Sequence, residues 1–302
     1  MPLFNDILKK IIPGNIISPI YHSSIFNNNK ASKLAITTKR LDLCSSQIAN
    51  ILFLSSLSSN YPLRDKVCME IGSGWVLSHA LIFYLLGAKK IIATDIQRIA
   101  SPKSLYLSIH RSIISIIRDI LSPFEDHHII RSRMNRLLEI NKFSFDILKE
   151  LGITYIAPID LVKEPLNMKI DYIFSNSVLE HIPVSNIPPF LKNLTDNLSP
   201  EGKMIHCIHL EDHKDSYNAP FDFLSESKEK FTNDIQTARG NRIRLNHWEK
   251  ILSQTNNIDF KIIYKHSRLD KKMPEKIDNS IDYKNEEDLR ISHIGILGTK
   301  TG

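Results

Sequence analysis

Two glycines separated by one residue follow an acidic residue at the end of an apolar run, in the stretch VCMEIGSGW. Gly72 would let the chain turn sharply off a strand, and Gly74 would let the backbone approach a ligand closely. Asp95 ends the next apolar run, 21 residues after Gly74, where a carboxylate can accept hydrogen bonds from both hydroxyls of a ribose. This spacing predicts a site for an adenosine-containing cofactor.

The residues around the glycines indicate which cofactor. No Gly-Lys-Ser/Thr follows, which excludes a P-loop, and Leu77 stands where a dinucleotide fingerprint has its third glycine. Glu70 would repel a pyrophosphate, but it suits a ligand that carries an amino group and a sulfonium cation. The pattern favours S-adenosylmethionine over NAD. Glu70 could instead cap the helix that follows, and the glycines could make only a turn.

Five stretches, in this order along the chain, resemble motifs of the class I S-adenosylmethionine-dependent methyltransferases. They are the glycine turn EIGSG, the acids in ATDI and APIDL, the stretch IDYIFSNSVLEHIP and the stretch LSPEGKMIHCI. The resemblance covers residues 66–300, apart from an insertion and a charged loop. Val76 departs from it, because most members have a glycine there. The resemblance implies cofactor-binding roles for Glu70, Gly72, Ser73, Gly74, Asp95, Ile96, Asp160, Leu161 and Asn176.

Histidines gather in the two loops that face the transferred methyl group in that family. A histidine that titrates near neutral pH is a suitable base for an alcohol or a phenol. His209, at the end of the predicted fifth strand, is the first choice of base, and His181 is the rival. Asp212 could orient a histidine, and His213 could contact the acceptor. His206 alternates to the opposite face of its strand and is expected to pack under a helix.

Use of a metal ion is left open. Some ubiquinone-pathway and small-RNA O-methyltransferases carry Glu-x-x-Glu-His after the fourth strand, with a later histidine, and hold a divalent ion. Here Ser177 replaces the first glutamate, while Glu180 and His181 occupy the last two positions. These two residues and His209 could still bind an ion.

The acceptor is expected to be a small molecule or a sugar, methylated on a hydroxyl. The Asn/Asp-Pro-Pro pattern of nucleobase methyltransferases is missing, since Asn176 is followed by Ser-Val-Leu. The net charge of +6 and the pI of about 9.0 keep RNA or protein methylation as an alternative, but Lys and Arg are scattered and a nucleic-acid partner is not expected. A non-catalytic protein of the same fold is another alternative, because Val76 and Ser177 depart from the family pattern.

Alternating strand and helix patterns predict the elements that position these residues. The expected fold is α/β: a Rossmann-like, mostly parallel sheet of seven strands, with helices on both faces and an antiparallel last strand paired with its predecessor at one edge. Ligands would bind beyond the carboxyl ends of the strands. Strands are expected at 66–71, 90–95, 153–160, from 169, at 203–210, 259–267 and 291–300, and helices at 40–57, 78–88, 104–123, 134–152, 188–202 and 245–256.

These elements suggest a helical N-terminal extension at 1–60 and a methyltransferase domain at 61–302. The domain would carry a helical insertion at about 97–150, because no strand pattern occurs there. The charged run 268–290 is expected to be an exposed loop.

The composition is that of an ordinary globular protein, with 42% hydrophobic and 24% charged residues. Three widely spaced cysteines, Cys44, Cys68 and Cys207, form no CxxC pair and are expected to be buried free thiols in a reducing compartment. No signal peptide or membrane span is recognised, so a cytoplasmic location is expected. The oligomeric state is not predicted.

Overall fold

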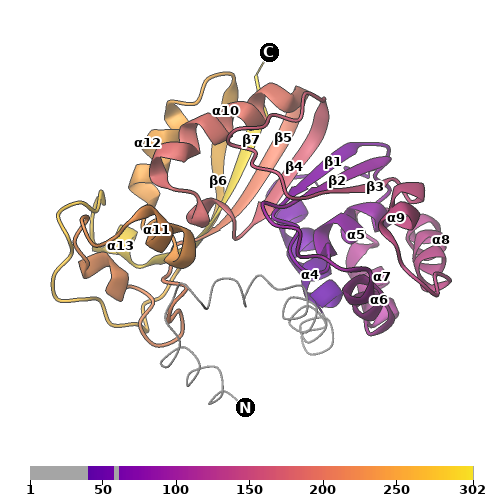
Figure 1. The fold of residues 1–302 in the computed structure, drawn as a ribbon, viewed down its shortest axis with the longest axis horizontal. Helices are drawn as coiled ribbons and strands as arrows, with labels where there is room; N and C mark the ends of the chain where they lie inside the picture. The colour runs from indigo at the N-terminus through magenta and orange to yellow at the C-terminus, as the bar shows by residue number, and fades with distance from the viewer. Residues whose placement is uncertain (1–39, 58–60, 302) are drawn as a thin grey trace.

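The computed structural model describes residues 40–57 and 61–301, which form one seven-stranded sheet between two layers of helices (Figure 1). The strand order is β3-β2-β1-β4-β5-β7-β6, and β7 runs antiparallel to both of its neighbours. The predicted fold class is therefore confirmed, including the antiparallel pair of last strands at one edge. The strands are β1 (Val67–Ile71), β2 (Lys90–Thr94), β3 (Ile153–Ile156), β4 (Ile170–Asn176), β5 (Leu198–His209), β6 (Ile258–Ser267) and β7 (Ile291–Lys300).

Two hydrophobic cores lie on the two faces of the sheet. Cys68 of β1 faces a core with α4 (Arg40–Leu54) and α5 (Ser78–Leu85), whereas Met69 faces a core with α10 (Ile187–Asn197) and α12 (Leu245–Ser253). Successive strand residues point to opposite faces, so a strand buried on both sides needs a nearly continuous apolar run. The sequence VCMEI of β1 meets that need.

The helix α4 agrees with the helix predicted at 40–57 and packs against α5. Residues 1–39, the rest of the predicted N-terminal extension, lie outside the described part of the chain. The division into an extension and a main domain stays a prediction.

The insertion at 97–150 is helical, but the two long helices predicted within it were wrong. It contains four short helices: α6 (Pro102–His110), α7 (Ile114–Leu121), α8 (His127–Leu138) and α9 (Phe145–Glu150). In Figure 1 they lie beside β3, at the end of the molecule opposite α11 (Asn233–Arg239) and α13 (Glu286–Leu289).

Capping residues explain two of these helix starts. The Asp126 side chain accepts from the N–H of His128 at 2.7 Å at the start of α8, and Ser144 accepts from the N–H of Ile147 at 3.1 Å at the start of α9. Asp and Ser are favoured N-cap residues because they satisfy donors that a first helical turn leaves unpaired. The helical spacing of apolar residues in the sequence did not show where one helix ends and the next begins.

The boundary between α10 and β5 also differs from the prediction. The helix expected at 188–202 ends at Asn197, and β5 begins directly at Leu198, which pairs with Ile170 of β4. Pro200 cannot continue a helix because it lacks an N–H. The strand therefore begins five residues before the predicted start at residue 203.

Two segments outside the sheet fold together into what we call the side lobe, residues 211–244 and 268–290. It contains η3 (Asp222–Ser225), α11 (Asn233–Arg239) and α13 (Glu286–Leu289). The prediction that 268–290 is an exposed loop is confirmed for most of the segment. Ile281 and Leu289 are exceptions, because apolar side chains from both segments form a third core. Its buried members are Phe221, Phe223, Leu224, Phe231, Ile281 and Leu289.

Arg244 joins the side lobe to the sheet. Its side chain is fully buried and donates to the carbonyl oxygens of Leu210, of Leu289 at 3.2 Å and of Ile291 at 3.3 Å. Burial lowers its pKa to about 10, so the guanidinium remains charged near neutral pH. One side chain therefore fixes the segment after β5, the end of α13 and the start of β7.

The three cysteines are buried, as predicted, and none of them forms a disulfide. Among the described residues, we find no helix with the length and apolar character that crossing a bilayer requires.

Replacing Arg244 with methionine should destabilise the fold strongly. The change keeps much of the buried volume but leaves three carbonyl oxygens without their donor, and each such loss costs about 1–3 kcal/mol. We expect the free energy of unfolding, measured in urea, to fall by about 3 kcal/mol or more. The control Lys250→Met breaks an exposed ion pair with Asp282 and should change it by less than about 1 kcal/mol. Equal effects of the two changes would contradict this role of Arg244.

Candidate active site

The glycine turn lies where β1 leaves the sheet, and both of its glycines have positive φ angles. Gly72 has φ 70° and Gly74 has φ 64°. A Cβ at Gly72 would collide with the side chain of Val178, whereas a Cβ at Gly74 would meet nothing closer than 4.0 Å. Gly72 is therefore required by close packing against the segment after β4. Gly74 leaves its backbone open to a ligand.

Asp95, directly after β2, is bonded to this turn. One carboxylate oxygen accepts from the N–H of Gly74 at 2.9 Å, and the other accepts from the N–H of Gln97 at 3.0 Å. Burial raises the pKa of Asp95, and these backbone bonds oppose that rise. Each oxygen can accept a further hydrogen bond, so a ligand's hydroxyls could bind here.

A first cavity of about 400 Å³ opens on one side of the turn. Its polar wall contains Asp95 and Asp160, and Asp160 accepts from the N–H of Val162 at 3.0 Å. Its apolar wall includes Ile96 and Leu161, and Ile96 is 66% exposed. A large exposed apolar side chain beside two carboxylates suits a flat ring that carries a polar sugar.

A second cavity, of about 220 Å³, lies on the other side of the turn and contains Glu70, Ser73 and Asn176. Glu70 is 1% exposed. One of its oxygens lies 2.8 Å from Nδ1 of His79, and the other accepts from the N–H of Ala80 at 3.0 Å. Glu70 therefore holds the first turn of α5 while also lining this cavity.

The helix α4 contributes Gln47 to the same network, which the sequence did not indicate. The Gln47 side chain donates to the amide oxygen of Asn176 and lies 3.1 Å from Nε2 of His79. Burial lowers the pKa of His79, but contacts with Cys44 and Glu70 outweigh it and raise the pKa to about 10. His79 is therefore a buried cation between Glu70 and Gln47, and it partly neutralises Glu70.

Four histidines meet beyond the ends of β4 and β5, and we call them the histidine cluster: His181, His209, His213 and His293. Ring centroids lie 4.6 Å apart for His181 and His213, 5.4 Å for His209 and His213, and 3.7 Å for His209 and His293. The structure thus brings the three predicted histidines together. His293 was missed, because it reaches the cluster only through its pairing with His209 across β5 and β7.

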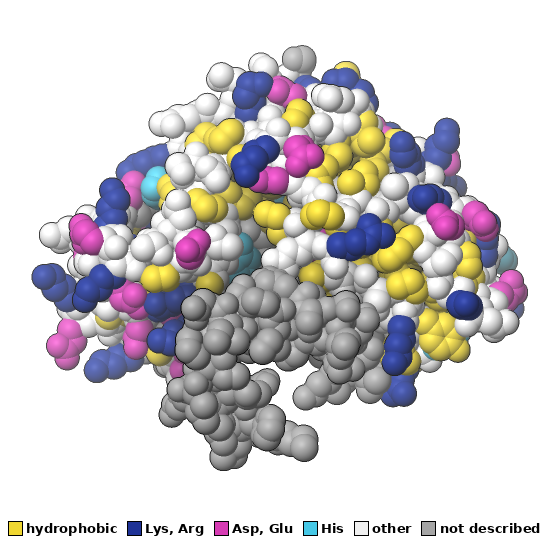
Figure 2. All heavy atoms as spheres, in the orientation of Figure 1, with side chains coloured by type: hydrophobic (Ala, Val, Ile, Leu, Met, Phe, Trp, Pro, Cys, Tyr) yellow, Lys and Arg dark blue, Asp and Glu magenta, His cyan; other side chains and the backbone are white. Residues whose placement is uncertain are grey.

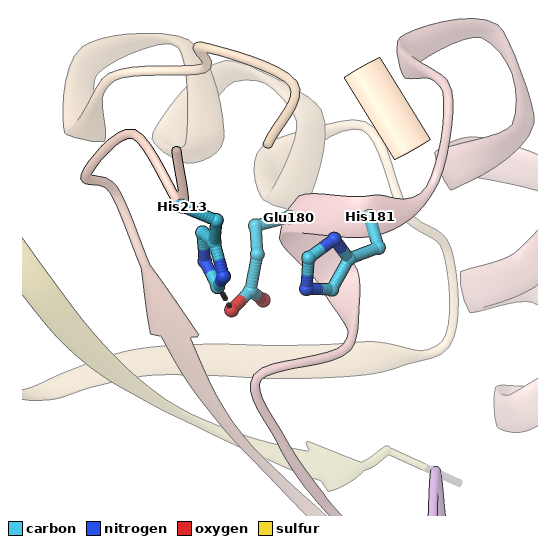
Figure 3. A group of neighbouring side chains, drawn as sticks. All are labelled: Glu180, His181 and His213. Atoms are coloured by element: carbon cyan, nitrogen blue, oxygen red, sulfur yellow. Dashed lines mark ion pairs between the residues drawn. The ribbon is translucent and has the colours of Figure 1, made fainter. Parts of the chain in front are cut away.

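Glu180, in η1 (Leu179–His181), lies at the centre of this group. Figure 3 shows its carboxylate between the rings of His213 and His181. Oε1 accepts from the backbone N–H of His209 at 3.3 Å and lies 3.6 Å from Nε2 of His213. The buried Oε2 has no hydrogen-bond partner. His181 also lines the first cavity, so the cluster adjoins the space beside Asp95.

His181, His209 and His293 are partly buried, whereas His213 is exposed. Burial is the main cause that lowers the pKa of His181, that of His209 to about 3 and that of His293 to about 4. These three rings are neutral near pH 7, with a lone pair on one nitrogen each.

Asp212 does not fill the role predicted for it. It pairs with Arg239, which donates to its two oxygens at 3.1 and 2.5 Å. Asp212 also accepts from the backbone N–H of Lys214. The carboxylate anchors the side lobe, where sequence reasoning expected it to orient a histidine.

His206 is packed in the core, as expected. It is 0% exposed, and its Nδ1 lies 2.7 Å from the hydroxyl of Ser175. Its Nε2 has no hydrogen-bond partner, and burial lowers its pKa to about 3.

No family model matches the sequence, and no curated protein matches it either. Among solved structures, magnesium protoporphyrin IX methyltransferase from Synechocystis PCC 6803, determined with bound SAH, is 12% identical with a TM-score of 0.46, over 95% of this chain and 99% of that chain. An S-adenosylmethionine-dependent methyltransferase from Mesorhizobium loti is 13% identical with a TM-score of 0.45, over 83% of this chain and 98% of that one. At such distances, function has to be argued from this chain's own residues.

His206 should make stability depend on pH in a defined window. Its ring is neutral in the folded protein down to about pH 3, whereas the unfolded chain binds a proton below about pH 6.5. Its contribution to stability is therefore complete above about pH 6.5 and is lost as the pH falls from there toward 3, by up to about 1.4 kcal/mol per pH unit. We expect urea unfolding of His206→Leu to show a shallower loss between about pH 6.5 and 5 than the unchanged protein.

The control for this measurement is Ile208→Ala on the same face of β5, in the same core. It should lower stability by a similar amount at every pH in the window. If His206→Leu shows the full slope of the unchanged protein, the proton taken up on unfolding does not come from His206.

Proposed function

We propose that this chain is a class I S-adenosylmethionine-dependent methyltransferase. The observation that carries the proposal is the pair of cavities on either side of one glycine turn, with Asp95 in the first and Glu70 in the second. The parts of the cofactor fit this division. The adenine would lie against Ile96 and Leu161 near Asp160, the ribose at Asp95, and the amino-acid part beside Asn176 and Glu70.

A dinucleotide fits the same features less well. The dinucleotide-binding sheet has the order 3-2-1-4-5-6, whereas here antiparallel β7 lies between β5 and β6. Leu77, where a pyrophosphate site needs its third glycine, is 0% exposed and packs in the core. Three carboxylates, Glu70, Asp95 and Asp160, line the two cavities beside one cationic side chain, His79, and this excess of negative charge supports a cationic ligand.

The acceptor is a small molecule methylated on a hydroxyl, with a sugar as one such class. The first cavity extends from Asp95 to His181 and Thr237, so the space next to the methyl group borders the histidine cluster. In the transfer, the acceptor O–H gives its proton to a base of this cluster, the O–CH₃ bond forms as the S–CH₃ bond breaks, and S-adenosylhomocysteine leaves. Among the two predicted bases, only His181 is in the cavity lining.

The surface supports a small acceptor over RNA. Figure 2 shows basic and acidic side chains interspersed over the described part of this face, with no continuous basic band. Strong RNA binding draws on clustered Lys and Arg along the path of the phosphates.

Calorimetric titration of S-adenosylmethionine, S-adenosylhomocysteine and NAD tests the cofactor. We expect the first two to bind and NAD not to bind. Asp95→Asn removes a charged acceptor and should weaken both by about 10-fold or more. Gly74→Ala should weaken them because its Cβ enters open ligand space, and Asp282→Asn, a distant change, should leave both affinities unaltered. Binding of NAD in place of the other two ligands would overturn the proposal.

The acceptor class is tested with methyl-labelled S-adenosylmethionine. Panels of small alcohols, phenols and sugars are compared with total RNA and with protein. Label transferred to a small hydroxyl compound supports the proposal as stated. Label found only in RNA or protein would keep the enzyme class and replace the acceptor.

A further inference from the structure

The Glu180 carboxylate is buried without a matching cation. It is 1% exposed, and Oε2 has no hydrogen-bond partner. Within the described residues its only ion-pair neighbour is His213, and no lysine or arginine pairs with it. An ionised carboxylate is strongly disfavoured inside a protein unless a charge or several donors compensate for it. A cation bound beside Oε2 would give this buried oxygen the partner that it lacks.

His181 is held in the form that binds metals. Its Nδ1–H donates to the carbonyl oxygen of Thr237 at 2.8 Å, which leaves a lone pair on Nε2 of the neutral ring. Metal-binding histidines usually fix their second nitrogen in this way, often on a backbone carbonyl. The Thr237 carbonyl belongs to α11, so the side lobe sets the orientation of this ring.

The geometry points to a site for one divalent transition-metal ion, bound by Glu180, His181 and His213. One ligand atom from each residue lies within 4.8 Å of the others, and Figure 3 shows the carboxylate between the two rings. A set of two imidazoles and one carboxylate suits zinc, iron or cobalt better than magnesium, which prefers oxygen ligands. Three protein ligands leave further coordination positions for water or a substrate.

A neighbouring group, His209, Glu211 and His293, has similar ligand atoms but is already satisfied. Glu211 pairs with Arg268 at 3.1 Å, which neutralises its charge. The Nε2 atoms of His209 and His293 are 2.6 Å apart, so one donates its proton to the other. Variants of this group therefore serve as controls for metal binding by Glu180, His181 and His213.

The position of the ion would give it a role in the reaction, and that part of the inference rests on the proposed function. His181 lines the first cavity, so an open coordination position there can take the acceptor's oxygen. An ion lowers the pKa of a bound hydroxyl, which eases loss of the O–H proton before the methyl group arrives. The acceptor is then one whose oxygen can bind a metal. His181 would act as a ligand and not as the base, and the lowered pKa of the bound hydroxyl would let its proton pass to solvent water.

Metal binding is measured directly on the full chain without an affinity tag, after chelator treatment and dialysis. Co²⁺ is followed by its visible absorption and Zn²⁺ by calorimetry, with Mg²⁺ as comparison. We expect one equivalent of Co²⁺ or Zn²⁺ to bind, and Mg²⁺ to bind far more weakly. The three cysteines are buried and should not compete strongly.

The variants Glu180→Gln and His213→Gln each remove one ligand. Loss of a residue that only hydrogen-bonds to a metal ligand weakens metal binding by ~10–100-fold. Loss of a ligand itself should weaken Co²⁺ and Zn²⁺ binding by more than this in both variants. Glu211→Gln and His293→Gln should leave the affinity within a few-fold of the unchanged protein. Circular dichroism and thermal unfolding identify any variant that fails to fold, and the partly exposed His213 is the safer of the two ligand positions.

Absence of Co²⁺ and Zn²⁺ binding by the unchanged protein overturns the inference. So does binding that survives His213→Gln and is lost in His293→Gln, because it places the ion in the neighbouring group. The cofactor titration is separate from these measurements. Metal binding without S-adenosylhomocysteine binding would overturn the methyltransferase proposal and leave the metal site standing.

Discussion

The geometry of the candidate site depends on how the glycine turn is bonded to the end of β2. The N–H of Ser73 donates to the carbonyl of Thr94 at 2.9 Å, and the N–H of Gly74 donates to Asp95 at 2.9 Å. These two bonds fix the backbone between β1 and α5 and aim Asp95 at the same point. The close approach of Val178 to Gly72 then brings the segment after β4 against the turn. The two cavities are the spaces that remain on either side.

The grouping of residues around the glycine turn could be predicted from sequence because its signals are local. Glu70, Gly72, Gly74 and Asp95 lie on one strand-turn-helix-strand unit, and their spacing follows from that unit alone. The network that supports them could not be predicted. Gln47 reaches Asn176 across 129 residues, and nothing in the pattern of α4 marks that residue as different from the rest of the helix.

The histidine half was predicted only in part, for a related reason. His181, His209 and His213 follow two parallel strands, so their convergence follows from the fold class. His293 depends on the register of antiparallel β7 against β5, which local patterns do not specify. Asp212 was predicted to orient a histidine, but it pairs with Arg239. That partner lies 27 residues away in a lobe that no sequence motif predicted.

The side lobe supplies the Thr237 carbonyl that orients His181, and it is attached to the sheet through Arg244. Its own stability comes from an aromatic core and from the pairing of Asp212 with Arg239. The early strands and the turn therefore define the two cavities, while the side lobe sets the orientation of His181 in the histidine cluster. Because Glu180 lies between His181 and His213, a change in the lobe that moved either ring would alter how that buried charge is balanced. The arrangement of the histidine cluster thus depends on packing well outside the sheet.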